Sequence, residues 1–352
     1  MSRQVLIERS GRSNRRAARG VRRRRQVILR RLTRGIGLPV GLVVALSVGS
    51  VAAAGPSVRN GDITFMRQDQ AGFWQTWVAS AGMRHQRQLT DEDANSGWPV
   101  WAPTGHRLAI DSDRADPDPR DDTPVNDVFV LRTDGSGLRK VTDSVGVSGD
   151  PGWSPDGSLL AYQADRGDYP GRQGIYVSRP DGSRLRRITV LPPDAGLDAA
   201  ARFSPDGRSL VFTRYRDDGR GGEESALFTV RLDGRHERQV TPFALHSGDA
   251  TWSPDGRRLV LEAYPTPTSR GDVYTVHRDG SRLCNLTRND PAMAGSADPV
   301  WSPDGKLILF LSATTTRGEQ VGGLTTMKPN GTARAFVSAD PMFEHQPDWA
   351  AH

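Results

Sequence analysis

The sequence predicts an all-β fold: a six-bladed β-propeller of four-stranded antiparallel blades, with the ring closed by a C-terminal strand that joins the first blade. Two observations predict this fold. One is a short motif that recurs along the chain at intervals of 48 to 52 residues, and a period of this size indicates a repeat architecture. The other is a set of short apolar strand signals within each repeat, separated by turn residues.

The recurring motif is an aromatic residue followed by Ser-Pro-Asp-Gly. Its aromatic positions, including a weaker first copy and a truncated last one, are Trp101, Trp153, Phe203, Trp252, Trp301 and Trp349. Proline presets the backbone angle of a turn, aspartate bonds to nearby amides, and glycine accepts a positive φ. Each copy therefore predicts a tight hairpin, and we expect the aromatic side chains to pack between neighbouring blades.

A second turn, Asp-Gly, recurs later in each repeat. In the third repeat we expect strands at 159–162, 174–177 and 187–189 around the turn Asp181-Gly182. The strand groups end in Thr90, Thr142, Thr189, Thr241, Thr287 and Ser338, which gives six blades. The first group lacks an aromatic strand and residues 347–350 supply one, so the last strand should close the ring and leave no open edge.

Together these motifs resemble the TolB-type propeller repeat over roughly residues 58–352. The resemblance implies a propeller and an envelope location, since TolB is a periplasmic protein of the Tol-Pal system. TolB carries an α/β domain before its propeller, whereas here we expect the propeller without that domain. Similar repeats form the gating propeller of prolyl-oligopeptidase-like enzymes, but six blades leave no room in 352 residues for their hydrolase domain.

Charge divides the chain into three parts. Residues 1–34 hold thirteen Arg, one Glu and no Lys or Asp, residues 35–54 are uncharged and apolar, and residues 55–352 carry a net charge of about −6. We interpret 1–34 as an Arg-rich cytoplasmic n-region, 35–54 as a signal peptide or signal-anchor, and 55–352 as the propeller. The propeller is then extracytoplasmic, and nucleic-acid binding is not expected despite the net charge of +6.

Two points about the leader stay open. Arg24-Arg25 fits the twin-arginine pattern loosely, so both the Sec and the twin-arginine routes remain. Cleavage after Ala54 would release the propeller, whereas retention of 35–54 would make the membrane a partner through an N-terminal helix.

The order of the strands separates the two faces of the ring. Both tight turns fall on one face, while the connections between second and third strands and between blades fall on the other. The second face carries longer, dissimilar loops at 111–126, 214–225, 264–271 and 287–297, and variable loops on a rigid scaffold usually carry recognition. We therefore expect partners to bind there.

The residue three places before each aromatic should lie near the central channel. These residues are Trp98, Asp150, Ala200, Asp249, Asp298 and Gln346. Three carboxylates around one mouth repel one another unless a cation, a basic partner or hydrogen bonds compensate. An alternative is that each Asp only bonds amides at its own strand start. His246 and His345 lie on connections of the same face and are also candidates to reach a ligand, although solvated loop histidines are the simpler interpretation.

Other chemical signals are weak. The acidic run 111–118 offers oxygens for calcium, but it lacks the EF-hand spacing, and we expect a solvated acidic loop. No metal ligand set, catalytic triad or phosphate loop is recognisable. The single cysteine, Cys284, excludes an internal disulfide and should face solvent.

The sequence therefore favours an exported, monomeric, non-enzymatic propeller that binds a protein or peptide of the cell envelope and needs no cofactor. The competing hypothesis is an enzyme at the channel mouth, a lyase, lactonase or glycan-active hydrolase, that uses a bound cation such as calcium.

Overall fold

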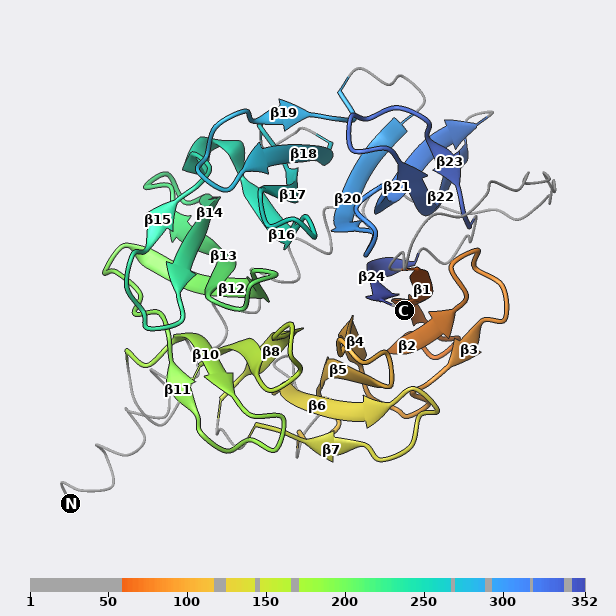
Figure 1. Cartoon of the computed structure of the whole chain (residues 1–352), viewed down its shortest axis with the longest axis horizontal. Coiled ribbons are helices and arrows are strands. Elements are labelled where there is room, and N and C mark those ends of the chain that lie inside the picture. Colours follow the sequence, from red (N-terminus) through yellow and green to blue (C-terminus); the bar gives the residue numbers. More distant parts are fainter. Residues whose placement is uncertain are drawn as a thin grey trace.

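The computed structural model describes residues 59–116, 125–142, 146–165, 171–266, 270–288, 293–316, 319–338 and 344–351. They form six four-stranded antiparallel sheets arranged in a ring around a central channel (Figure 1). Within this part of the chain the one helix is a short 3-10 turn, η1 (Phe243–Leu245). The predicted all-β, six-bladed fold is confirmed.

Each blade runs from an innermost strand at the channel to an outermost strand at the rim. Blade 1 contains β24 (His345–Ala351), β1 (Asn60–Gln68), β2 (Trp74–Ala79) and β3 (Arg87–Gln88). Blade 2 contains β4 (Ser96–Trp101), β5 (Arg107–Ser112), β6 (Asp127–Arg132) and β7 (Arg139–Lys140). Blade 3 contains β8 (Ser148–Trp153), β9 (Leu160–Ala164), β10 (Gly174–Ser178) and β11 (Arg186–Arg187).

The remaining blades repeat this order. Blade 4 contains β12 (Ala195–Phe203), β13 (Ser209–Asp217), β14 (Glu223–Arg231) and β15 (Arg238–Gln239). Blade 5 contains β16 (Ser247–Trp252), β17 (Arg258–Ala263), β18 (Asp272–His277) and β19 (Cys284–Asn285). Blade 6 contains β20 (Met293–Trp301), β21 (Ile308–Thr316), β22 (Glu319–Met327) and β23 (Ala335–Phe336).

Ring closure follows the prediction. The C-terminal β24 pairs with β1, with Ile63 opposite Trp349, and so completes blade 1. The first and last strands of the chain thus lie in one sheet, and the sheet that would otherwise end in an open edge is paired.

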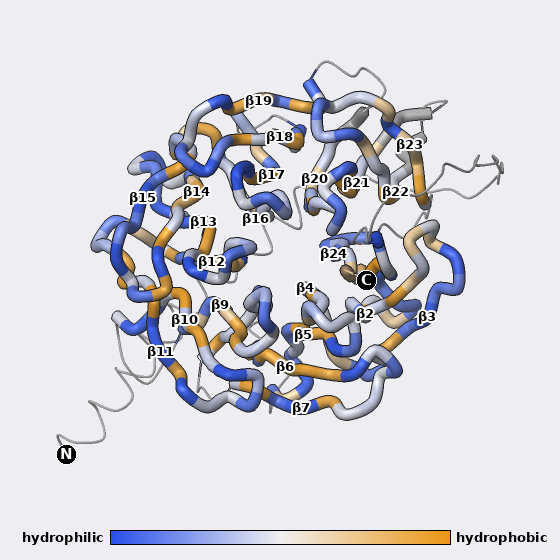
Figure 2. Tube along the Cα trace, viewed as in Figure 1, coloured by the Kyte–Doolittle hydropathy of each residue, from blue (hydrophilic) through white to orange (hydrophobic). Residues whose placement is uncertain are grey.

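The apolar core is divided among the interfaces between blades. Six hydrophobic clusters each combine residues of two neighbouring blades, and the cluster of Trp349 joins blade 1 to Val300, Leu309 and Leu324 of blade 6. Figure 2 shows orange apolar positions within the ring of strands and bluer residues at the turns. Of the repeat aromatics, Trp101, Phe203, Trp252, Trp301 and Trp349 are buried, and Trp153 is partly buried. Area removed from water in this way stabilises the ring.

Two faces are distinct. The turn face carries the inner turns 102–106, 154–159, 204–208, 253–257 and 302–307 and the outer turns 80–86, 133–138, 179–185, 232–237, 278–283 and 328–334. The opposite loop face carries the connections between second and third strands and between blades. Two expectations about it need correction. Residues 214–225 are mostly strand, because β13 and β14 extend to a short turn, and β20 already begins at Met293 within the expected loop 287–297.

The outermost strands are also shorter than the sequence predicts. β11 covers only Arg186–Arg187 rather than 187–189. The backbone of the terminal threonine is outside the strand, and its side chain instead of its backbone bonds to the neighbouring strand. The Oγ1 atom of Thr189 accepts a hydrogen bond from the backbone N–H of Ile175 at 2.9 Å.

The predicted n-region 1–34 and the apolar segment 35–54 lie outside the described residues. Within the described residues, no helix has the length and apolar character needed to cross a membrane.

Candidate functional site at the channel mouth

The six positions three places before the repeat aromatics share an unusual backbone conformation. Their φ angles are 46° at Trp98, 53° at Asp150, 52° at Ala200, 43° at Asp249, 52° at Asp298 and 49° at Gln346. At each of them the innermost strand slips register against its neighbour, as between Gly248 and Thr251 in β16. The repeat therefore builds a β-bulge with a left-handed residue into every innermost strand.

A bulge of this kind re-aims one side chain and bends the strand. Left-handed φ is costly for residues other than glycine, so the surrounding sheet must hold it. Five of the six bulge residues line a cavity in the channel, namely Trp98, Ala200, Asp249, Asp298 and Gln346. Asp150 is buried beside its own blade and is not among the residues around this cavity.

The second strand of each blade supplies another ring of side chains opposite the bulges. The ring consists of Met66, Asp111, Gln163, Thr213, Glu262 and Leu311. All six side chains are buried. The side chains near the channel therefore come from the first and second strands of each blade. The repeat aromatics indicate only the position of the first strand.

Carboxylates of the bulge residues and of the second-strand ring accept hydrogen bonds from the backbone of the next blade. Glu262 Oε2 accepts a hydrogen bond from the backbone N–H of Asp298 at 3.1 Å. Asp298 in turn accepts from the backbone N–H of Gln346 at 3.1 Å and from its side-chain Nε2 at 2.6 Å. The amides are those of bulges in the following blade. The alternative that each Asp bonds the start of its own strand is therefore wrong for Asp298, since its amide partner lies one blade further on.

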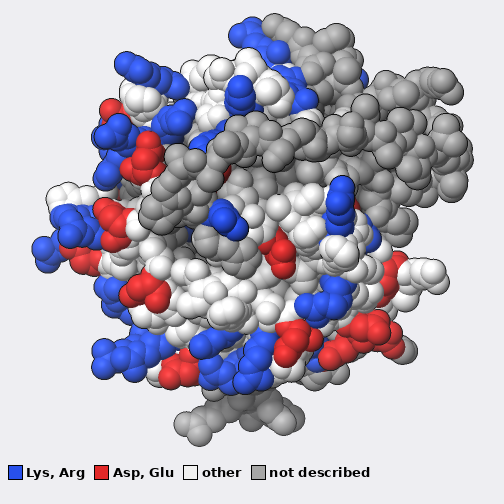
Figure 3. Space-filling view, turned by 45° about the vertical axis from the view of Figure 1, so that its right-hand side comes forward, with Lys and Arg blue, Asp and Glu red and all other residues white. Residues whose placement is uncertain are grey.

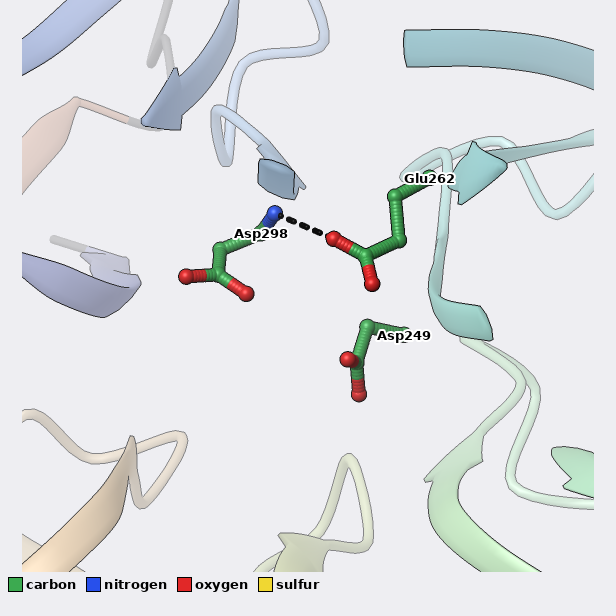
Figure 4. Close-up of side chains that lie close together, drawn as sticks. All are labelled: Asp249, Glu262 and Asp298. Atoms are coloured by element: carbon green, nitrogen blue, oxygen red, sulfur yellow. Dashed lines mark hydrogen bonds between the residues drawn. The ribbon is translucent and has the colours of Figure 1, made fainter. Parts of the chain in front are cut away.

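Three carboxylates converge on one side of the channel. Asp249 of β16, Glu262 of β17 and Asp298 of β20 each offer an oxygen within 4.8 Å of the others (Figure 4). Burial raises the pKa of Glu262 well above its usual range, and the charges of Asp249 and Asp298 raise it further. The cluster thus places negative charges close together in a buried environment. Binding of a cation, or protonation of a carboxylate, is therefore favourable there.

Hydroxyl groups surround the same cluster. Burial, followed by the nearby carboxylate charges, raises the pKa values of Tyr215 and Tyr264 well above the normal tyrosine range. Both hydroxyls therefore stay protonated. Within the described residues, the buried Oη of Tyr264 and Oγ1 of Thr213 have no hydrogen-bond partner, and buried polar atoms of this kind normally have one.

The channel itself is narrow. The cavity between the bulge residues has a volume of about 30 Å³, which is room for one or two water molecules. A small ion or the tip of one side chain fits this cavity.

The two histidines are placed differently. His345, at the start of β24, is buried, packs edge-on against Trp74 at 5.2 Å and lies with Nδ1 3.5 Å from Asp298 Oδ2. The interpretation of His345 as a solvated loop residue is therefore wrong. His246 follows η1, is half-buried on the loop face and is not in contact with the acidic cluster in any described interaction.

The acidic run at 111–118 also differs from its expectation. Asp111 and Asp113 are buried, with exposed fractions of 1% and 2%. Asp111 accepts from the backbone N–H of Asp150 at 3.3 Å, and Asp113 accepts from the backbone and side chain of Asn95. These two carboxylates are hydrogen-bonded parts of the blade rather than a solvated loop, and residues 117–118 lie outside the described residues. Cys284 is exposed, as expected.

Glu262 is the site residue that the repeat motif did not indicate. It lies four residues into the second strand, at the register position of Asp111 and Gln163, so an alignment of second strands would have exposed it. Four of the six residues at this position are polar, although it follows the apolar residues of each second strand, and this was the available signal.

Comparisons with known proteins agree with this architecture. No protein-family model matches the chain. A TolB homologue of Chlorobium luteolum is 30% identical over 160 residues, which cover 46% of this chain and 33% of that protein. The chain thus spans only about a third of this relative's length.

Solved structures share the fold. TolB from Acinetobacter baumannii superposes with a TM-score of 0.64 at 20% identity, covering 82% of this chain and 66% of that one. An oligogalacturonate lyase in complex with manganese superposes with a TM-score of 0.54 at 14% identity, covering 81% and 74%. The described chain is a six-bladed propeller built from a TolB-like repeat.

Proposed function

We propose that this protein is an exported, non-enzymatic propeller that binds a basic segment of a cell-envelope protein or peptide at the loop-face mouth of its channel, and that it acts as a monomer. The observation that carries the proposal is the convergence of Asp249, Glu262 and Asp298 within 4.8 Å at that mouth. A lysine or arginine side chain would neutralise carboxylates that otherwise repel one another.

The size of the cavity between the bulge residues is in keeping with the end of a peptide side chain. A cavity of about 30 Å³ accepts the end of one side chain. The rest of the segment would lie across the loop face, where variable connections on a rigid scaffold usually carry recognition. The TolB-like repeat supports an envelope location, which the predicted leader at 1–54 also favours.

Removal of the acidic cluster should weaken the capture of basic peptides. We expect the triple variant Asp249→Asn, Glu262→Gln, Asp298→Asn to bind a lysine- and arginine-rich peptide about tenfold or more weakly than the wild type, because charge complementarity is lost. Calorimetric titration of the full chain at two salt concentrations measures this effect. The melting temperature should hold or rise, since Glu262 no longer faces two like charges.

The matched control is Asp218→Asn. Asp218 is an exposed loop-face carboxylate in the β13–β14 turn, outside the channel, where its Oδ1 accepts backbone N–H groups that asparagine also satisfies. This variant should bind like the wild type. Equal affinity of the wild type for an acidic peptide, or an unchanged affinity of the triple variant, would contradict the proposal.

A second candidate is an enzyme or binding protein that uses a hard cation in the same cluster. Calcium takes carboxylate oxygens at about 2.3–2.6 Å, so ligands on opposite sides of the ion lie about 5 Å apart, in keeping with a separation of up to 4.8 Å. The unpartnered hydroxyls of Thr213 and Tyr264 add oxygens close by. A related fold is that of the lyase solved with manganese.

Metal binding separates this candidate from the first. If the cluster holds a cation, the purified full chain should contain calcium or manganese in stoichiometric amount, and a chelator should lower its melting temperature, because a ligand that binds only the folded state stabilises it. Glu262→Gln should abolish that shift. If the purified protein contains no metal and its melting temperature changes with neither calcium nor the chelator, the cation-binding candidate is excluded.

A further inference from the structure

The turn face carries a charge opposite to that of the rest of the propeller. Its eleven turns, together with the strand residue on each side of every turn, hold nineteen Lys or Arg and nine Asp or Glu. The remainder of residues 55–352 holds fifteen Lys or Arg and thirty-one Asp or Glu. An acidic protein body thus presents one strongly basic face. Figure 3 shows one side of the molecule, on which Lys and Arg lie among Asp and Glu.

The carboxylates on this face are occupied by the turns themselves. Asp156, Asp206, Asp255 and Asp304 of the inner turns each accept a hydrogen bond from the preceding serine hydroxyl at 2.6 to 2.7 Å. Their outer-turn counterparts accept from backbone N–H groups two residues on, as in Asp181 with Ser183 at 2.9 Å. These bonds hold the carboxylates close to the backbone. Several of the arginines donate to backbone oxygens of the next blade, as Arg139 does to Pro180 and Arg238 to Asp279, yet these side chains remain exposed and their charge stays at the surface of the face.

Apolar side chains are exposed among the basic ones. Leu138, Leu185 and Leu283 occupy the same position in three outer turns, directly before the outermost strand, with exposed fractions of 36%, 43% and 40%. Each is adjacent in sequence to an arginine: Arg139, Arg184 or Arg282. Basic residues with exposed leucines on one face are typical of surfaces that lie against a membrane.

The chain also enters the propeller on this face. Asn60, at the start of β1, accepts a hydrogen bond from the backbone N–H of Asp304 in an inner turn at 3.3 Å. Only four residues, 55–58, separate the apolar segment 35–54 from the first described residue, Arg59. Four residues span at most about 14 Å. When 35–54 lies in a bilayer, the turn face must therefore lie beside that bilayer.

We infer that the turn face docks onto the anionic headgroups of a lipid bilayer. Basic side chains meet the negative surface, and the exposed leucines reach the boundary between headgroups and acyl chains. This inference goes beyond the proposed function and does not depend on it. It leaves the acidic loop face directed away from the membrane, toward any soluble partner.

Cys284 provides a native reporter for this contact. It is the single cysteine of the chain, it is exposed, and it follows Leu283 at the edge of the turn face. The full chain is reconstituted in nanodiscs of phosphatidylcholine alone or with phosphatidylglycerol, and the rate of maleimide labelling is measured. We expect labelling of Cys284 to be at least fivefold slower in the anionic discs. A loop-face reporter, Cys284→Ser with Arg220→Cys, should label equally fast in both.

A variant tests whether the basic side chains cause the protection. Arg208→Ser, Arg257→Ser and Lys306→Ser introduce the residue that blade 3 carries as Ser158, and Arg184→Gly and Arg282→Gly introduce the one that blade 2 carries as Gly137. Because native turns already contain these residues, the melting temperature should not fall. Since residues 1–54 are unchanged, their own lipid contacts cancel in the comparison, and the protection of Cys284 in anionic discs should disappear.

Three outcomes would overturn the inference. One is equal labelling of wild-type Cys284 in neutral and anionic discs, and another is full protection of the five-substitution variant. The third is protection by soluble heparin without protection by anionic discs, which would assign the face to a soluble polyanion instead.

Discussion

At the scale of single residues, the channel is shaped by left-handed backbone positions and by carboxylates that bond across blades. Asp348 is a further case, in addition to Glu262 and Asp298. Its Oδ2 accepts a hydrogen bond from the backbone N–H of Trp101, in the next blade, at 2.7 Å. Burial raises the pKa of Asp348 to about 6, although the Trp101 bond and the charge of Arg202 act in the opposite direction.

This raised pKa predicts a pH dependence of stability. The folded protein binds the proton more tightly than the unfolded chain, so the contribution is complete below the ordinary value near 3.8 and is lost as the pH rises through about 6. The loss amounts to at most about 3 kcal/mol, at about 1.4 kcal/mol for each pH unit between the two pKa values. Asp348→Asn keeps an acceptor for Trp101 and cannot ionise. We expect it to raise the free energy of unfolding at pH 8 and leave it unchanged at pH 3.5.

Denaturant unfolding of wild type and variant at several pH values measures this difference. Glu262 shifts in the same direction and remains in the variant, so some pH dependence persists. If the stabilisation by Asp348→Asn were the same at every pH, the effect would come from packing and not from ionisation.

At the scale of elements, the same contacts recur at the turns and strand ends of every blade. The hydroxyl at the end of each strand group accepts a hydrogen bond from a backbone N–H of the third strand in all six blades, at Thr90, Thr142, Thr189, Thr241, Thr287 and Ser338. A side chain thus satisfies an amide that the two-residue outermost strand leaves unpaired. This explains why a hydroxyl residue ends every repeat.

The glycines of the two turns differ in what surrounds them. Gly182, with φ at 82°, has the backbone oxygen of Val141 in the preceding blade 2.4 Å from the place of a Cβ atom. Gly157, with φ at 69°, meets only Pro103 Cδ at 3.7 Å, an ordinary contact. Outer turns therefore press against the neighbouring blade's backbone, whereas inner turns touch it lightly.

Alanine substitutions test this difference. Gly157→Ala should cost about 1–2 kcal/mol, the price of a left-handed backbone alone. Gly182→Ala adds a clash with a backbone carbonyl, so we expect it to cost at least about 1 kcal/mol more. Thermal unfolding of the two variants under the same conditions measures the two losses of stability. Equal losses would show that the outer turn can move away from the neighbouring blade without a loss of stability.

At the scale of the whole molecule, closure and charge separation define the protein. Pairing of β24 with β1 makes the two chain ends neighbours and removes the open edges of the first and last repeats. The same strand order places basic turns on one face and most acidic residues elsewhere. The membrane-docking surface and the site for basic peptides that we propose would lie on opposite faces, so binding at one would leave the other open.

The fold was predictable because the local structure of each repeat follows from its own turn residues and apolar strand segments. Trp252-Ser253-Pro254-Asp255-Gly256 contains the turn, and the fixed interval to Trp301 gives the blade. The position of Asp249 and Asp298 near the channel followed from counting back from these aromatics. Their partners did not follow, because bonds such as that from the backbone N–H of Gln346 to the carboxylate of Asp298 join residues 48 positions apart.

The sequence by itself determined the number of blades, the closing strand and the face on which each turn lies, since these depend on local turn chemistry and on period. Only the tertiary structure brought Glu262 next to Asp249 and Asp298 and buried Asp111 and His345. The reason is physical: register within a strand is local, whereas the distance between side chains on different blades depends on how the ring closes. Burial and the resulting pKa shift of Glu262 exist only once that closure has excluded water.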